Sequence, residues 1–201
     1  GLRESSAQTY VMAARSVFSW CVRGGTLPAN PVAQVRMGRV EKGRKSAWVD
    51  AATRDRLIAA ACGDMRRVLV LGFLCGLRLG EILEARRRWI DRQSMAIHVP
   101  NRQPLGDIPG EWRTKDLDGR NVPLTRQALK LLGHLPTDPE AYLIAPGVGH
   151  GRWRYRWDPR RPWRQFVAAQ GVPDLTPHVM RHTFASLLVQ RGVSLYKVAR
   201  W

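Results

Sequence analysis

The sequence predicts a mainly α-helical fold with a small antiparallel β-sheet. Apolar residues recur every three or four positions through most of the chain, polar capping residues open these stretches, and short alternating stretches lie between residues 94 and 124. Hydrophobic residues make up 44% and charged residues 24% of the 201 residues. Both values are typical of a folded globular protein.

The first 36 residues are expected to be the C-terminal part of a helical domain. Residues 6–23 have the spacing of one amphipathic helix, and a short second helix is expected to open at Pro31, where proline loses no hydrogen bond. Two helices are too few to bury a core of their own. Residues 37–47 contain four basic residues, two glycines and almost no apolar residue, which predicts a basic linker.

Residues 48–201 are expected to form the main domain. Its predicted helices cover residues 50–61, 65–75, 79–87, 125–132, 160–170, 176–190 and 194–201. A strand is predicted over residues 94–99, and residues 111–115 and 120–124 are expected to pair as a hairpin joined by residues 116–119. The sheet is therefore expected to be inserted between helices.

The charge of the chain indicates a polyanionic partner. Basic residues number 33 against 16 acidic ones, which gives a formal net charge of +17 and a pI near 11.3. Of the basic residues 28 are arginine, whose planar fork suits phosphate oxygens. A solvated basic surface, or an arginine-rich composition inherited from a GC-rich genome, would give the same numbers.

Cysteine usage and hydropathy favour a soluble intracellular protein. Cys21, Cys62 and Cys75 are odd in number and lack metal-ligand spacing, so they are interpreted as reduced core thiols. No stretch approaches the ~20 apolar residues of a membrane span, and the N-terminal residues lack the pattern of a signal peptide.

Two segments carry residues suited to phosphate chemistry. Arg78 stands at a helix start after Gly76, with Glu81 three residues later, although a surface arginine paired with Glu81 would have the same spacing. His178 and Arg181 are three residues apart and share one face of a predicted helix. For His178 alone, a hydrogen-bonded histidine at a helix start is the alternative.

These segments resemble the two signature boxes of the tyrosine recombinase, or phage integrase, family, which read Gly-Leu-Arg-x-x-Glu-hydrophobic and His-x-x-Arg-His-Thr. Between them, Lys115 and the later Val122-Pro123-Leu124 are similar to the family's hairpin lysine and the proline that follows it. Residues 20–31 resemble the end of the family's helical core-binding domain. The chain therefore looks like a tyrosine recombinase catalytic domain preceded by that end.

The resemblance implies a site-specific recombinase or integrase of a phage or mobile element. Such an enzyme cuts and rejoins duplex DNA through a 3′-phosphotyrosine, without metal or other cofactor, and acts as a homo-tetramer in the cytoplasm of a bacterial or phage-infected cell. The implied catalytic residues are Arg78, Lys115, His178 and Arg181, with Lys115 as general acid. Glu81 is expected to orient Arg78, and His182 is expected to be structural.

The nucleophilic tyrosine is expected beyond Trp201, where the family pattern continues with Leu-Gly-His or similar and then the tyrosine. The 201 residues alone are therefore expected to be inactive in cleavage. Tyr10, Tyr142, Tyr155 and Tyr196 are poor candidates, and Tyr196 is expected in the core. A type IB topoisomerase relative, and a non-catalytic DNA-binding remnant of an integrase, stay open as alternatives.

The segment around residues 152–164 interleaves tryptophans with arginines. Trp153, Trp157 and Trp163 either contact DNA together with these arginines or anchor the segment in the core. The sequence does not choose between the two, so these residues are not assigned to the site.

Overall fold

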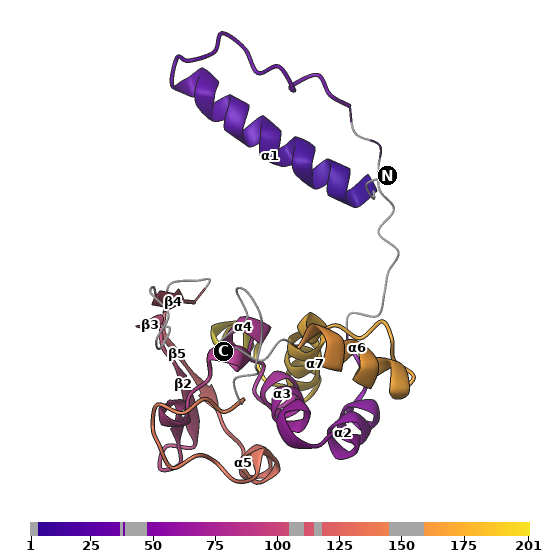
Figure 1. The fold of residues 1–201 in the computed structure, drawn as a ribbon, viewed down its shortest axis with the longest axis vertical. Coiled ribbons are helices and arrows are strands. Elements are labelled where there is room, and N and C mark those ends of the chain that lie inside the picture. The colour runs from indigo at the N-terminus through magenta and orange to yellow at the C-terminus, as the bar shows by residue number, and fades with distance from the viewer. Residues whose placement is uncertain (1–3, 37, 39–47, 105–110, 115–117, 145–158) are drawn as a thin grey trace. The chain divides into compact units, whose positions relative to one another are not determined.

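The chain forms two compact units, residues 1–45 and residues 46–201 (Figure 1). The structure is a computed structural model that describes residues 4–36, 38, 48–104, 111–114, 118–144 and 159–201. The assignment of residues 1–36, 37–47 and 48–201 to two domains and a linker stays a prediction. Among the described residues, no helix is long and apolar enough to cross a membrane.

The first unit contains one long helix, α1 (Glu4–Arg23), as the apolar spacing predicts. The expected second helix is wrong, because residues 31–34 form turns. The side chain of Asn30 accepts a hydrogen bond from the Val32 N–H at 3.0 Å, and its carbonyl accepts one from the Ala33 N–H at 3.1 Å. This local bonding offers the backbone an alternative to a helix.

Seven α-helices and one 3-10 turn are described in the second unit. They are α2 (Ala51–Ala60), α3 (Gly63–Phe73), α4 (Leu79–Glu84), the 3-10 turn η1 (Arg87–Trp89), α5 (Arg126–Leu132), α6 (Arg160–Ala169), α7 (Pro177–Gln190) and α8 (Leu195–Arg200). Asp50, Thr125 and Ser194 cap α2, α5 and α8, because their side chains accept hydrogen bonds from backbone N–H groups in the first turns of these helices.

Helix α4 ends three residues before the expected Arg87. The backbone after it bonds elsewhere, because the Arg87 N–H donates to the Ala141 carbonyl at 2.9 Å and the Leu143 N–H donates to the Ala85 carbonyl at 2.8 Å. Long-range pairing thus replaces the last turn that local spacing predicts.

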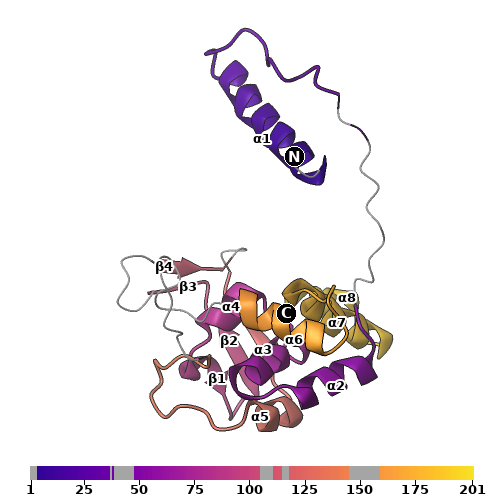
Figure 2. The ribbon, with the colours of Figure 1, turned by 45° about the vertical axis from the view of Figure 1, so that its right-hand side comes forward.

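The core of the second unit is built around α3. Its residues from Val68 to Phe73 are all buried, and the helix contacts α2, α4, α5 and α7. In Figures 1 and 2 the strands lie on one side of this unit and α2, α6 and α7 on the other, with α4 between them. The helix that precedes Arg78 and the helix that carries Arg181 are therefore direct neighbours in space.

The strands form two antiparallel sheets. They are β1 (Ile90–Asp91), β2 (Ala96–Val99) and β5 (Arg120–Pro123) in the order β1-β2-β5, and β3 (Arg102–Pro104) with β4 (Glu111–Arg113). The register of the first sheet pairs Ile97 with Val122, both buried, and that of the second pairs Gln103 with Trp112.

The predicted pairing of residues 111–115 with residues 120–124 is wrong, because these segments belong to different sheets. Trp112 of β4 pairs with Gln103 of β3, and its ring lies against that of Trp89, with centroids 5.7 Å apart. Strand β5 pairs with β2 instead, which buries Val122 against Ile97.

The three cysteines are free thiols with different environments. Cys75 is buried as expected, and burial raises the pKa of its thiol to about 12. The expectation of a core thiol is wrong for Cys62, which is exposed in the connection between α2 and α3, and Cys21 is only half-buried.

Candidate active site

Arg78 stands at the N-terminal end of α4, directly after the turn that ends α3. Gly76 forms this turn with a φ of 65°, a conformation that favours glycine, and the Leu77 N–H bonds back to the Leu71 carbonyl at 3.1 Å. The Arg78 N–H then donates to Glu81 Oε2 at 2.7 Å, while its Nη1 donates to Oε1 at 3.3 Å. Both the backbone and the side chain of Arg78 are thus held by one carboxylate.

Arg181 reaches the same turn from α7. Its Nη1 donates to the carbonyl of Gly76 and, at 3.3 Å, to the carbonyl of Trp201. A Cβ on Gly76 would lie 2.3 Å from Cδ1 of Phe184, so only glycine lets the two helices approach this closely. The close approach brings Arg181 to the turn that precedes Arg78, about a hundred residues earlier in the sequence.

Arg120 was not found by sequence reasoning, yet it is the strongest partner of Glu81. Its Nη1 and Nη2 donate to the two carboxylate oxygens of Glu81 at 2.7 and 2.6 Å, a forked contact from β5 to α4. Its Nε donates to the carbonyl of Trp201. The spacing of Glu81 and Arg120 along the chain carries no signal of this pairing.

The carboxylate of Glu81 is only 2% exposed and lies between Arg78 and Arg120. Burial acts to raise its pKa, but the hydrogen bonds and charge of Arg120 and then of Arg78 outweigh burial. The pKa of Glu81 therefore lies below its ordinary value of 4.5. Glu81 is ionised at neutral pH and holds both guanidinium groups by charge.

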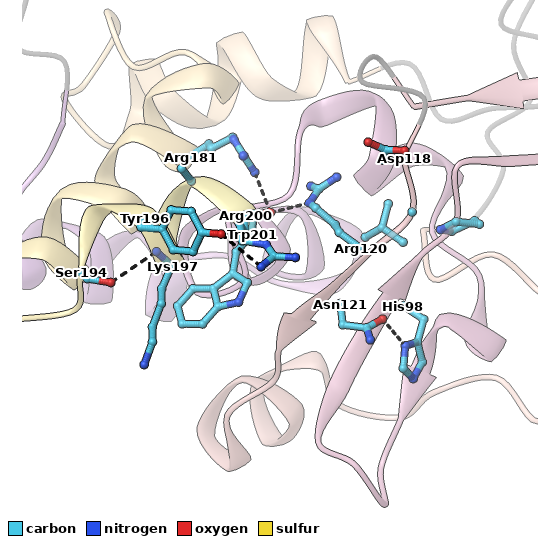
Figure 3. A pocket seen from close by; sticks show the side chains of 14 residues that line it. His98, Asp118, Arg120, Asn121, Arg181, Ser194, Tyr196, Lys197, Arg200 and Trp201 are labelled. Atoms are coloured by element: carbon cyan, nitrogen blue, oxygen red, sulfur yellow. Dashed lines mark hydrogen bonds between the residues drawn. The ribbon is translucent and has the colours of Figure 1, made fainter.

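A cavity of about 1160 Å³ opens beside this network, between strands β2 and β5 and helix α8. Arg120 and Arg181 point into it and meet at the carbonyl of Trp201 (Figure 3). Lys197 and Arg200 add positive charge to its lining, and among the described residues Asp118 is the one acidic side chain there. Arg78 is not in the lining, so the cavity overlaps only one side of the arginine network.

The expectation that Tyr196 lies in the core is wrong. Its side chain is 72% exposed and lines the cavity, where its hydroxyl accepts a hydrogen bond from Arg200 at 3.5 Å. The short helix α8 buries Val198, and that one buried position leaves its other side chains outside the core.

His178 lies in the first turn of α7, three residues before Arg181, and is exposed. Its ring meets that of His182 edge to face, with centroids 4.4 Å apart. His182 is itself exposed and not part of the core. The first two turns of α7 thus present two imidazoles and the Arg181 guanidinium.

Lys115 lies outside the described residues. The neighbouring Thr114 is buried, and its N–H donates to the Asn101 carbonyl at 2.8 Å. The site role of Lys115 therefore stays a prediction, as do the roles of Arg78, His178 and Arg181. Of the expected arginine-rich segment, Trp163 is buried and its indole N–H donates to the Leu175 carbonyl at 2.9 Å, while Trp153 and Trp157 lie outside the described residues.

Comparison with known proteins matches residues 47–201 to the phage integrase family. The chain is 26% identical over 199 residues to the tyrosine recombinase XerC of Chlamydia trachomatis serovar L2, covering 91% of this chain and 58% of that protein. It is 29% identical over 204 residues to XerC of Xanthomonas axonopodis pv. citri, covering 97% of this chain and 62% of that protein. The chain thus spans about three-fifths of the length of these relatives.

Solved structures show the same fold. The Tn1549 transposon integrase in complex with a circular intermediate DNA has a TM-score of 0.72 at 16% identity, covering 100% of this chain and 71% of that one. A lambda integrase dimer bound to a core site has a TM-score of 0.58 at 19% identity, covering 97% and 70%. The family match covers most of the chain, and the chain belongs to the phage integrase family of tyrosine recombinases.

Proposed function

We propose that the protein is a site-specific recombinase or integrase that cuts and rejoins duplex DNA through a 3′-phosphotyrosine intermediate. The proposal depends mainly on the hydrogen bond from Arg181 to the carbonyl of Gly76, because Gly76 lies in the turn that leads directly into Arg78. Arg181 thus bonds the backbone two residues before Arg78, although the two arginines come from segments far apart in sequence. Such a pair suits the extra negative charge of a phosphate under attack.

In the proposed reaction each residue has a separate task. Arg78 and Arg181 bind the non-bridging oxygens of the scissile phosphate and stabilise the charge of the transition state. Lys115 donates a proton to the leaving 5′ oxygen, and His178 hydrogen-bonds the phosphate or takes the proton of the nucleophile. The nucleophile is the tyrosine that the family pattern places after Trp201, and no metal is needed for these steps.

The proposed substrate is duplex DNA, bound mainly through phosphate contacts. The net charge of +17 supports this, as do the solved structures of the transposon integrase with a circular intermediate DNA and of lambda integrase bound to a core site. Binding is expected to weaken steeply with salt, because each neutralised phosphate releases counterions. A titration of binding against salt that gives a flat log–log slope contradicts phosphate-based binding.

The proposed assembly is a homo-tetramer on two paired DNA sites. Light scattering of the full-length protein mixed with a site-bearing duplex measures the mass of the complex. A complex that never exceeds one protein per DNA, under conditions that support cleavage, contradicts the tetramer.

Covalent capture of DNA tests the reaction. The full-length protein, extended through the expected tyrosine, should link to the 3′ phosphate of a nicked suicide substrate, whereas residues 1–201 alone should form no adduct. In the extended protein, Arg78→Ala or Arg181→Ala should slow adduct formation by roughly a hundredfold or more.

The role of Lys115 has its own test. Lys115→Ala should also slow cleavage, but a substrate with a 5′-bridging sulfur, whose thiolate leaves without a proton, should largely rescue this variant. The same substrate should not rescue Arg181→Ala. Equal rescue of both variants, or an adduct with residues 1–201 alone, contradicts the assigned roles.

A further inference from the structure

Arg120 occupies a place in the arginine network that the proposed mechanism does not use. Its fork faces Glu81 at 2.7 and 2.6 Å, and its side chain is only 13% exposed. Arg120 lines the cavity with Arg181, and its Nε donates there to the Trp201 carbonyl (Figure 3), but its two Nη atoms donate to the buried carboxylate of Glu81. An arginine committed in this way is poorly placed to bind a phosphate directly.

Glu81 connects Arg120 to Arg78, because its carboxylate accepts hydrogen bonds from both arginines. One carboxylate oxygen, Oε2, accepts from both Arg120 Nη2 and the Arg78 N–H, and the other, Oε1, accepts from Nη1 of both arginines. The contact to the Arg78 guanidinium, at 3.3 Å, is the longest of the four. Arg78 therefore depends for its orientation on a carboxylate whose place is fixed mainly by Arg120.

We infer that Arg120 is a positioning residue, which fixes Glu81 and through it directs Arg78 toward the scissile phosphate. This inference rests on the proposed function. In this inference β5, the strand that follows Lys115 in the chain, is connected through Arg120 to α4, the helix that starts just after Arg78. Losing Arg120 should leave DNA bound but misdirect the group that stabilises the transition state.

A matched control exists in the same unit. Arg86 is as deeply buried as Arg120, with a side chain 8% exposed, and its Nη1 donates to the Glu140 carboxylate at 2.8 Å. Neither Arg86 nor Glu140 lines the cavity. Arg86→Gln removes another buried arginine without touching Glu81, so it measures the cost of losing such an arginine where its carboxylate partner, Glu140, is 54% exposed.

The experiment compares adduct formation by the full-length wild type, Arg120→Gln, Arg120→Lys and Arg86→Gln on the suicide substrate. Arg120→Gln should lower the cleavage rate at saturating DNA by roughly 10- to 100-fold while the DNA concentration for half-maximal rate changes little. Arg120→Lys should fall between it and the wild type, because lysine keeps the charge without the fork. The 5′-bridging sulfur substrate should rescue neither variant, and Arg86→Gln should cleave at the wild-type rate.

Two cleavage results overturn the inference. One is an Arg120→Gln rate within twofold of the wild type. The other is a loss of DNA affinity that accounts for the whole loss of rate, because Arg120 would then bind DNA itself. If Arg120→Gln fails to fold, as its thermal melt will show, Arg120→Lys is judged by the same criteria.

A second measurement separates this inference from the proposed function. Hydrogen exchange of the Arg78 amide, followed by NMR in protein with ¹⁵N-labelled arginine, should accelerate by about tenfold or more in the Arg120 variant and not in Arg86→Gln. If the wild type forms no adduct, the proposed function fails, and the exchange rate alone decides the inference. An unchanged rate at Arg78 overturns it.

Discussion

The carboxylates of Glu81 and Glu140, both in the main unit, are each held between two arginines, yet they lie in opposite environments. Glu81 bonds Arg78 and Arg120 and is 2% exposed, whereas Glu140 bonds Arg86 and Arg88 at 2.8 and 3.0 Å and is 54% exposed. The contact distances are alike. What differs is how much water each carboxylate has lost.

This difference decides what each cluster contributes. An exposed ion pair is screened by water and contributes about 0 to 1 kcal/mol, whereas removing one partner of a buried pair leaves an uncompensated charge and costs about 3 to 5 kcal/mol. Glu140 with its two arginines therefore contributes little to stability. Glu81 with its two arginines fixes the geometry beside the candidate site. Variants of the two carboxylates should therefore differ in their free energy of unfolding because of burial more than because of contact distance.

The largest expected effect comes from deleting each carboxylate. Glu81→Ala should lower the free energy of unfolding by about 3 to 5 kcal/mol, because Arg78 and Arg120 lose the charge that compensates them, and Glu140→Ala by about 1 kcal/mol or less. Urea denaturation of the two variants measures both. Equal losses would mean that burial does not distinguish the clusters.

The next largest effect is expected from a substitution at Gly76, where α3 and α7 pack closely beside Glu81 and its two arginines. Gly76→Ala should cost about 2 to 4 kcal/mol, because it combines backbone strain at a φ of 65° with a clash against Phe184. Gly171→Ala is the control, since Gly171 has a φ of 70° but no atom within 4 Å of an added Cβ. Thermal or urea denaturation should show a clearly smaller loss for the control.

A smaller effect should appear in the pH dependence of stability. The pKa of Glu81 is lowered in the folded state, so its stabilising contribution is fully present above its ordinary value of 4.5 and is lost as pH falls through the folded pKa. The difference in unfolding free energy between the wild type and Glu81→Gln should therefore narrow below about pH 4.5. Urea denaturation of both proteins from pH 6 to pH 3, in steps of about one pH unit, measures this difference. A difference in unfolding free energy that grows as the pH falls contradicts the lowered pKa of Glu81.

The smallest effect concerns salt. The loss caused by Glu140→Gln, a few tenths of a kcal/mol at low ionic strength, should vanish at about 1 M salt, where the screening length is about 3 Å. The loss caused by Glu81→Gln should persist, because its partners are shielded from the solvent. Denaturation at low and high salt compares the two, and a Glu81 effect that disappears with salt would contradict its burial.

Local signals in the sequence predicted the helices well. Capping residues such as Thr125 and Ser194, and glycines such as Gly171 and Gly192 just after α6 and α7, act within a few residues of the helix that they bound. The two arginine boxes were also visible, because their spacing within each helix is local. That the two boxes belong to one site was expected only from the family resemblance.

The pairing of the strands and the role of Arg120 were not predictable in this way. Strands of three or four residues carry too little alternation to choose a partner, so the nearest segment was chosen in place of β2 and β3. Arg120 meets Glu81 across 39 residues, at a distance for which no helical or hairpin spacing exists. Long-range partners of this kind are set by tertiary packing.

Burial of α3 has a consequence for how the protein is made. Six consecutive residues, from Val68 to Phe73, are buried, but α7 begins at Pro177, more than a hundred residues later. At ribosomal rates of about 5 to 20 residues per second, α3 leaves the ribosome roughly 5 to 20 seconds before the helix that covers it. For that interval the side of α3 that packs against α7 is expected to stay uncovered in a newly made chain, although α2, α4 and α5 can already contact the helix, and this exposed apolar surface favours aggregation.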